Sequence, residues 1–208
     1  MTVSPRRGII GWFAVAALLL LATPALAQKK PAADPDARAK HARPNSPDRT
    51  NNLDFLFGAL KAAPDVQSAK AVESRILALW VVSGSDTADL LMARAKTAAD
   101  AKDLDLAIRL LDALVEIKPD YVEAWNRRAT LQFLKKEYGK SVSDLQQVLA
   151  REPRHFGALA GLGMILQEVG DEKHALEVFR RALEINPHMA RIAELVKTLT
   201  EKVDGRDI

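Results

Sequence analysis

A spacing of 34 residues runs through the second half of the chain, where Pro119, Pro153 and Pro187 fall at this interval. Five further columns of small or apolar residues keep the same interval: Ala95, Ala129 and Gly163; Ala107, Ser141 and Ala175; Leu111, Leu145 and Phe179; Leu114, Val148 and Ala182; Leu91, Trp125 and Leu159. Self-similarity at a fixed period of this length is typical of proteins built from stacked supersecondary units. The period therefore restricts the fold to a repeat architecture before composition is considered.

Each unit has the pattern of two helices. Over residues 122–134, Trp125, Ala129 and Phe133 recur every four residues, which places them on one helix face. A polar break follows, and the second helix carries Leu145 and Val148 on its apolar stripe. The proline then ends the unit, because proline cannot continue a helix interior. We therefore expect one helical hairpin per period.

On these residues the units resemble tetratricopeptide repeats, with predicted bounds of 88–121, 122–155 and 156–189. The matching positions are Ala95, Ala107 and Pro119; Trp125, Ala129, Ser141 and Pro153; and Gly163, Ala175, Phe179, Ala182 and Pro187. Arg94 and Arg128 stand where the family usually has leucine, and Ala98 and Gln132 where it usually has an aromatic residue. The resemblance implies an all-α fold, a right-handed α-α superhelix or solenoid.

Both flanks of the repeats are also predicted to be helical. Residues 51–87 are interpreted as a degenerate repeat-like hairpin, since Phe55, Ala59, Ala71 and Ala78 follow the repeat spacing, whereas Arg75 stands at an apolar position. Val72, Ile76, Leu79 and Trp80 offer that hairpin a packing face. Residues 190–208 begin with an amphipathic helix that has one polar side and then form a tail. Such a helix is what a solenoid needs to close its exposed end.

The first 27 residues have the pattern of a secretory signal. Two arginines precede an apolar run from Ile9 to Ala22, and Ala25, Leu26 and Ala27 form a small-x-small cleavage site. The alternative is a retained membrane anchor, but the run is shorter than the roughly 20 residues that span a bilayer. We expect cleavage after Ala27, a periplasmic or secreted protein, and no stable membrane insertion afterwards. Residues 28–50, rich in proline and charge, are predicted to be a disordered linker.

Charge and composition restrict the chemistry. The formal net charge is +3, but the leader and the linker carry the positive excess and the chain from residue 51 onward is net negative. A nucleic-acid partner is therefore not expected, because binders of nucleic acid concentrate positive charge on the folded part. The chain has no cysteine, which excludes disulfides and cysteine-based metal sites or catalysis.

No catalytic or cofactor motif is found in the sequence. The histidines are His41, His155, His174 and His188, none in a metal-ligand pattern, and His155 and His188 are interpreted as equivalent turn positions. The chain contains neither a Gly-x-Ser-x-Gly elbow nor a phosphate-binding loop of the Gly-x-x-x-x-Gly-Lys type. We expect no enzyme activity, no metal and no cofactor.

Three glycines crowd the stretch "GALAGLGMI" at residues 157–165. A phosphate loop and a membrane-helix contact are the alternatives considered. The stretch follows a turn and not a strand, and its surroundings are too polar for a membrane span. We interpret it as a packing helix in which Gly163 permits a close helix approach. Gly157 and Gly161 could leave room for a guest.

The resemblance implies that the first helices of the repeats line a concave, partner-binding groove. The candidate residues are Met92, Lys96, Asn126, Thr130, Phe133, Ala160, Met164 and Gln167. Some tetratricopeptide proteins clamp a partner's terminal carboxylate with Lys, Asn and Arg, but here only Lys96 and Asn126 fit that role. An apolar peptide or helix is favoured, because methionine repacks around varied partners.

Arg127 and Arg128 are the most conspicuous polar cluster, and the simple interpretation is that they form ion pairs with acids such as Glu123. The function predicted is a non-catalytic adaptor or scaffold of the bacterial cell envelope, with an unidentified protein partner. An enzyme that uses the repeats as a frame and a self-assembling structural envelope protein are the alternatives.

Overall fold

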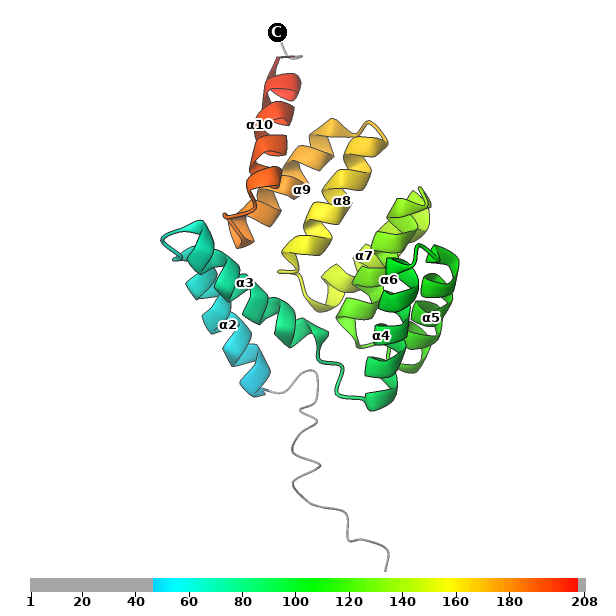
Figure 1. Ribbon diagram of the computed structural model, residues 1–208. Helices are drawn as coiled ribbons and strands as arrows, with labels where there is room; N and C mark the ends of the chain where they lie inside the picture. The colour runs from blue at the N-terminus through cyan, green and yellow to red at the C-terminus, as the bar shows by residue number, and fades with distance from the viewer. Residues whose placement is uncertain (1–46, 206–208) are drawn as a thin grey trace, which may run out of the picture. The chain divides into compact units, whose positions relative to one another are not determined.

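The computed structural model describes residues 47–205, and within that range it is built from helices without strands (Figure 1). The helices are α2 (Pro47–Lys61), α3 (Val66–Val81), α4 (Asp86–Asp100), α5 (Leu104–Ile117), α6 (Val122–Leu134), α7 (Tyr138–Arg151), α8 (Phe156–Glu168), α9 (Glu172–Ile185) and α10 (Ala190–Asp204). The predicted leader and most of the predicted linker lie outside the described residues. Helix α2 begins at Pro47, inside the segment 28–50 that the sequence predicts to be disordered.

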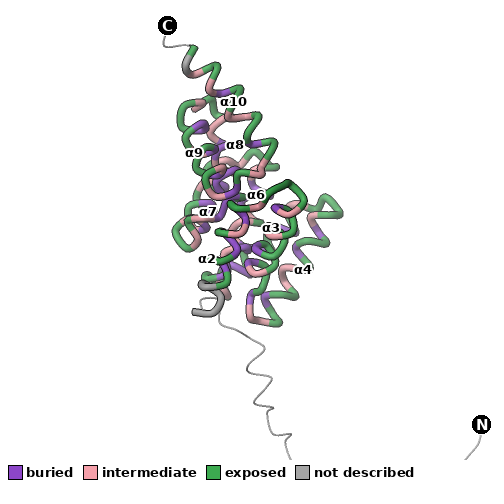
Figure 2. Tube along the Cα trace, turned by 90° about the vertical axis from the view of Figure 1, so that its left-hand side faces the viewer, coloured by how far each residue is buried: buried purple, intermediate pink, exposed green. Residues whose placement is uncertain are grey.

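The predicted all-α solenoid is confirmed, because its helices pair and stack in chain order. Helices α4 and α5, α6 and α7, and α8 and α9 each form a hairpin. Helices α6 and α8 begin at residues 122 and 156, where the predicted units 122–155 and 156–189 begin, whereas α4 begins at Asp86, before the unit predicted at 88–121. Helix α5 packs on α6, and α7 packs on α8, which joins successive hairpins. Buried residues follow the inner sides of the helices (Figure 2).

Small side chains let the two helices of a repeat approach closely. Ala95, Ala129 and Gly163 are buried where the first helix meets the second. At Gly163 a Cβ atom would lie only 2.6 Å from Cδ1 of Phe179, so no larger residue fits there. In the second repeat the Ser141 hydroxyl donates to the carbonyl of Ala129 at 2.7 Å, so the one polar member of its column is satisfied.

The turns inside the repeats share one backbone conformation. Lys102, Lys136 and Gly170 have φ values of 65°, 60° and 85°, the left-handed conformation that commonly ends a helix. The residue after each is the N-cap of the next helix. Asp103 and Asp171 accept the backbone N–H of the residue three positions later, which satisfies one of the free donors at a helix start.

Arg128 is accommodated by acids of neighbouring helices, although the family usually has leucine at its position. Its guanidinium binds both carboxylate oxygens of Asp144 at 2.7 Å and reaches Asp112 at 2.7 Å. It also lies 4.9 Å from the centre of the Trp125 ring. A bidentate pair of this kind is geometrically specific. Arg128 therefore links α5, α6 and α7 across the boundary between two repeats.

The hairpin of α2 and α3 buries a different set of residues from the repeats. Asp65 caps α3 by accepting the N–H of Ser68 at 2.7 Å. The buried apolar residues are Leu53, Leu56, Phe57, Leu60, Ala69, Ile76 and Trp80. Phe55, Ala71 and Ala78, which follow the repeat spacing, are exposed instead. The buried residues of this hairpin therefore do not follow the spacing of the repeats.

This hairpin lies against the N-terminal ends of α6, α8 and α10. Their N-cap residues are Tyr121, His155 and Met189, which share one column of the 34-residue spacing. The Tyr121 hydroxyl donates to the carbonyl of Val81, the His155 ring stacks on Trp80 at 4.1 Å, and Met189 packs on the hairpin core. The repeat counterpart of His155 is therefore Met189, and the sequence-based pairing of His155 with His188 is one residue out of register.

Two polar contacts extend the same interface. Arg154 binds Asp54 of α2 at 2.6 Å, and the Asn186 amide donates to Glu73 of α3 at 3.2 Å. Helix α3 contacts α6, whereas α4 packs mainly on α5, so the hairpin does not extend the stack of repeats. At the other end α10 packs on α9 through Ile192 and Leu199.

Among the described residues, no single helix is both long and apolar enough to cross a membrane. Helices α3 and α4 reach the required length and composition only when taken together, across a bend of 119°.

The two glycines of α8 give matched tests of the close helix approach. We expect Gly163→Ala to destabilise the protein by about 1–3 kcal/mol, because its methyl group would overlap the Phe179 ring. Gly161→Ala should instead be neutral or stabilise by up to about 1 kcal/mol, since its Cβ would meet Leu145 at an ordinary 3.7 Å and alanine favours helices. Urea unfolding midpoints measure both, and equal midpoints for the two variants would contradict this packing.

Candidate functional site

The larger cavity of the candidate site has a volume of about 440 Å³ and opens between the end of α3 and helices α4, α5 and α6. Its apolar walls are Val81, Met92, Ala93, Ala95, Ala99, Leu111 and Leu131. Its polar residues are Asp89, Lys96, Asp100, Glu123, Arg127 and Thr130. A cavity of this size, apolar with a few placed polar groups, is typical of ligand sites.

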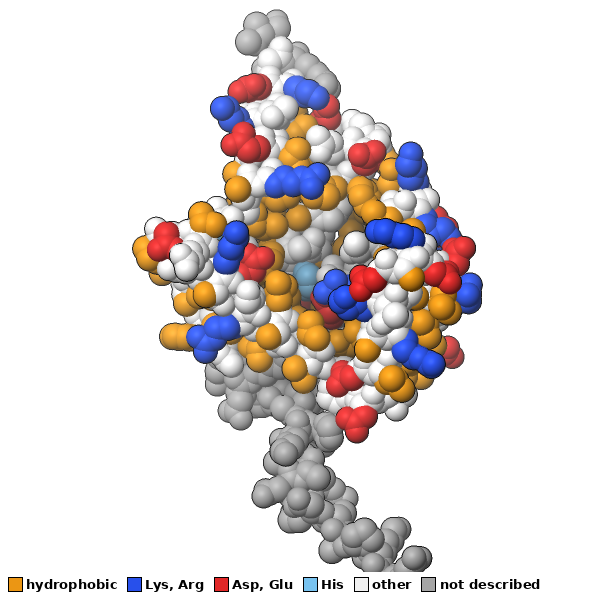
Figure 3. Space-filling view, in the orientation of Figure 1, with side chains coloured by type: hydrophobic (Ala, Val, Ile, Leu, Met, Phe, Trp, Pro, Cys, Tyr) orange, Lys and Arg blue, Asp and Glu red, His pale blue; other side chains and the backbone are white. Residues whose placement is uncertain are grey.

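A smaller cavity of about 200 Å³ lies between α6, α7 and α8. It is lined by Asn126, Ala129, Thr130, Phe133, Ser141, Leu145, Gly157, Ala160, Gly161 and Met164. Thr130 lines both cavities, so they adjoin along the face formed by α4, α6 and α8. Figure 3 shows apolar side chains around this hollow, with charged side chains at its edge.

The structure brings most of the predicted groove residues together. Met92, Lys96 and Thr130 line the larger cavity, and Asn126, Thr130, Phe133, Ala160 and Met164 line the smaller one. Gln167 lines neither. Sequence reasoning missed Val81, because α3 enters the site through a docked hairpin whose buried residues do not follow the repeat spacing.

The cations of the larger cavity are already paired with acids of the same cavity. Lys96 binds Asp100 at 2.5 Å, and Arg127 binds Glu123 at 2.7 Å, four residues earlier on α6. The predicted ion pair between Arg127 and Glu123 is thus confirmed, while Arg128 pairs with Asp144 and Asp112. The donors considered for a carboxylate clamp are also used, because the Asn126 amide donates to Glu123 at 3.1 Å.

Glu123 is a buried carboxylate that lines the larger cavity and faces His155, the residue stacked on Trp80 of the hairpin. Its side chain is 4% exposed, with Arg127, Asn126 and His155 around it. Burial alone would raise the pKa of Glu123, but the facing imidazole of His155, the charge of Arg127 and the amide of Asn126 outweigh it. Together they hold the pKa below its ordinary value of 4.5, so this carboxylate is ionised at neutral pH.

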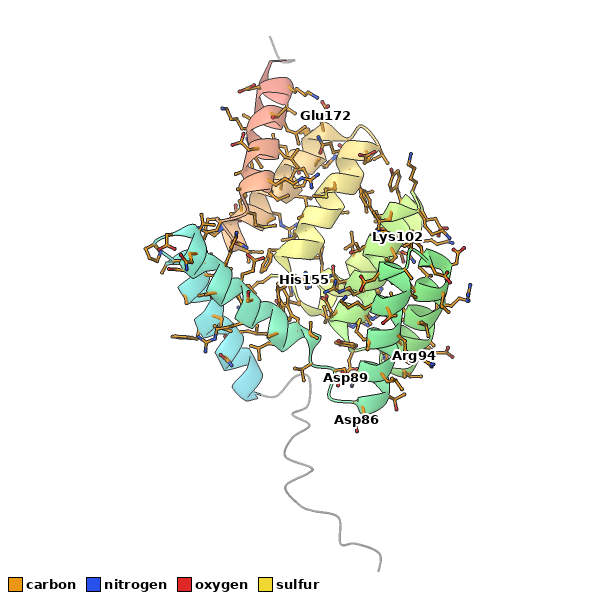
Figure 4. All side chains as sticks on the ribbon, in the orientation of Figure 1. Asp86, Asp89, Arg94, Lys102, His155 and Glu172 are labelled. Atoms are coloured by element: carbon orange, nitrogen blue, oxygen red, sulfur yellow. The ribbon has the colours of Figure 1, made fainter. Side chains whose placement is uncertain are left out.

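His155 joins this carboxylate to the hairpin. Its Nδ1 accepts the backbone N–H of Ala158 at 3.0 Å and so caps α8, which places the ring proton of the neutral form on Nε2. Nε2 lies 3.6 Å from Glu123 Oε2, beyond hydrogen-bond range, and the ring stacks on Trp80. Figure 4 shows His155 between α3 and α8. The interpretation of His155 as an ordinary turn residue missed this role.

The other described histidines give no metal site. His174 lies at an exposed helix start beside Asp171 at 2.8 Å, and His188 is half-buried in a turn. Within the part of the chain that the structure describes, no group of three or more His, Asp or Glu residues is placed to hold a metal ion. His41 lies outside the described residues.

Comparisons with known proteins agree with this architecture. Residues 92–147 and 156–189 match the tetratricopeptide repeat. A TPR repeat-containing protein of Rhizobium etli is 43% identical over 153 residues, which cover 74% of this chain and 75% of that protein.

Solved structures share the fold at low sequence identity. The Sgt2 TPR domain from Aspergillus fumigatus has a TM-score of 0.55 and 19% identity, covering 59% of this chain and 83% of that chain. The first TPR of Spaghetti bound to the HSP90 peptide SRMEEVD also has a TM-score of 0.55, with 18% identity, covering 58% of this chain and 95% of that chain.

A substitution at Glu123 tests the network beside the cavities. We expect Glu123→Gln to cost about 1–3 kcal/mol of unfolding free energy at neutral pH, because a buried charge-assisted network is lost. The depressed pKa makes this contribution fully present above pH 4.5 and lost as the pH falls through the folded-state value. Urea unfolding of both proteins across this range should show the gap narrowing towards acid. A gap that widens there would contradict the ionised, paired state.

Proposed function

Because the chain belongs to the tetratricopeptide-repeat family, we propose that it is a non-catalytic adaptor that holds a segment of another protein across its two adjoining cavities. Tetratricopeptide repeats serve as protein-interaction scaffolds, and the similar Spaghetti domain was solved with a bound peptide. The observation that carries the proposal is that Thr130 lines both cavities. Cavities of about 440 Å³ and 200 Å³, both mainly apolar, therefore adjoin on one face. Such a surface suits an extended or helical apolar segment.

The electrostatics of the larger cavity support a binding role over catalysis. A general acid near neutral pH needs a raised carboxyl pKa, whereas that of Glu123 is lowered by its partners. Lys96 and Arg127 are each paired with a carboxylate of their own helix. Of the five charged residues of the cavity, four thus pair with one another, and Asp89 accepts the Ser83 hydroxyl.

We place this adaptor in the bacterial cell envelope. The support is the sequence of residues 1–27, with its arginines, its short apolar run and the Ala25 to Ala27 cleavage pattern. Expression of C-terminally tagged protein in bacteria should give a periplasmic product that begins at Gln28, as measured by intact mass. A full-length product in the cytoplasm would contradict this localisation.

Groove substitutions test the adaptor itself. We expect tagged protein to capture a reproducible set of envelope proteins, and Met164→Glu to reduce that capture by tenfold or more, because it places an unpaired carboxylate beside the apolar walls of the smaller cavity.

Leu106→Glu on α5 is the matched control, since it also replaces an apolar side chain by a carboxylate, but at an exposed residue outside both cavities. Its capture should equal that of the unmodified protein. If Met164→Glu captured the same set at the same level, while its unfolding midpoint showed it folded, the proposed binding face would be wrong.

A further inference from the structure

The charges on the walls of the larger cavity are unequal. Three carboxylates, Asp89, Asp100 and Glu123, face two cations, Lys96 and Arg127. Arg94, although on the same helix, is not among the residues that line the cavity. The smaller cavity is lined by no charged residue at all. The combined site is therefore apolar with an acidic excess at one end.

An acidic partner would meet this site at a disadvantage. A partner's carboxylate at Arg127 would weaken the ion pair of that guanidinium with Glu123, whose own side chain is 4% exposed. Separation from Arg127 would leave Glu123 as a buried carboxylate with one charged partner fewer, which is costly. Lys96 and Asp100 are both exposed and neutralise each other, so this pair favours neither an acidic nor a basic partner.

A cationic partner meets no such obstacle. Asp89 is exposed in the first turn of α4, beside the end of α3, where Figure 4 shows it with Asp86. Its Oδ1 accepts the Ser83 hydroxyl, a contact that leaves its charge in place. A lysine or arginine of the partner can therefore approach Asp89 without breaking the ion pairs of Glu123 and Asp100.

The smaller cavity offers a binding site for an apolar side chain of the partner. Glycine at positions 157 and 161 keeps its floor open, because a Cβ at Gly161 would already lie 3.7 Å from Leu145 and a longer side chain would extend into the hollow. Phe133, Ala160 and Met164 surround this space with apolar surface. An apolar side chain of the partner is what such a pocket favours.

We propose that the partner segment is both apolar and basic: a large apolar side chain fills the cavity at Gly161, and a neighbouring lysine or arginine lies against Asp89. This proposal rests on the adaptor function above and specifies the chemistry of its partner. It separates this protein from a binder of acidic peptides, because the larger cavity has one carboxylate more than it has cations.

Two synthetic helical peptides of equal length and with blocked termini test the partner chemistry, one of leucine and lysine, the other of leucine and glutamate. Calorimetry with the mature protein should show binding of the Leu/Lys peptide at least tenfold tighter than that of the Leu/Glu peptide. The preference should shrink as salt rises, because salt screens exposed charges. The Gly161→Leu variant, which fills the smaller cavity, should lose the Leu/Lys peptide while keeping its unfolding midpoint.

Single neutralisations locate the basic contact. Asp89→Asn should weaken binding of the Leu/Lys peptide about threefold, the effect of an exposed ion pair. Asp120→Asn, an exposed acid in a turn outside both cavities, should leave its affinity unchanged.

Each contrary result has a distinct meaning. Equal or tighter binding of the Leu/Glu peptide, lost in Gly161→Leu, would overturn the basic partner and leave the adaptor function standing. Binding of neither peptide would also overturn it, and the capture experiment then decides on the adaptor. Unchanged affinity in Asp89→Asn would overturn the proposed basic contact.

Discussion

The close approach of the two helices within each repeat is the contact on which the rest of this structure depends. It needs a side chain no larger than alanine where the first helix crosses the second, as at Ala95 and Ala129, and in the third repeat only glycine fits under the Phe179 ring. Because the same spacing recurs three times, each hairpin presents its first helix at a similar place. The cavities between α4, α6 and α8 exist because these helices are held at a fixed separation by their partners.

Periodicity explains how much of this could be predicted from the sequence. The repeats follow from the 34-residue spacing, since a residue in one unit has a counterpart in the next. The α10 cap follows from its amphipathic pattern, and most groove residues follow from the family resemblance. Arg128 breaks the family pattern without breaking the fold, because Asp112 and Asp144 on the flanking helices surround it. An alignment of repeats cannot show such a compensation, since the acids lie in other columns and act only in three dimensions.

The docked hairpin could not be predicted in the same way. Trp80 and His155 come from segments with no shared period, and their stacking depends on the path of the chain between α3 and α4. The column of Tyr121, His155 and Met189 has no common chemistry, so its members look unrelated in the sequence. What they share is a position at the N-terminus of a helix that faces the hairpin. The burial of Glu123 could not be predicted from the sequence either, because an acid in a first helical turn is ordinarily explained by the helix dipole alone.

The hairpin also changes how cooperatively this chain is expected to fold. In an ordinary solenoid each repeat contacts only its neighbours, so folding can begin anywhere and an end can fray at little cost. Here Asp54 meets Arg154 across 100 residues of sequence, and Glu73 meets Asn186 across 113. Contacts of such long range slow folding and bind the two ends into one cooperative unit. The third repeat can unfold only if its contacts with the hairpin break. Unfolding of this short array is therefore expected to be all-or-none, as it is for a globular domain.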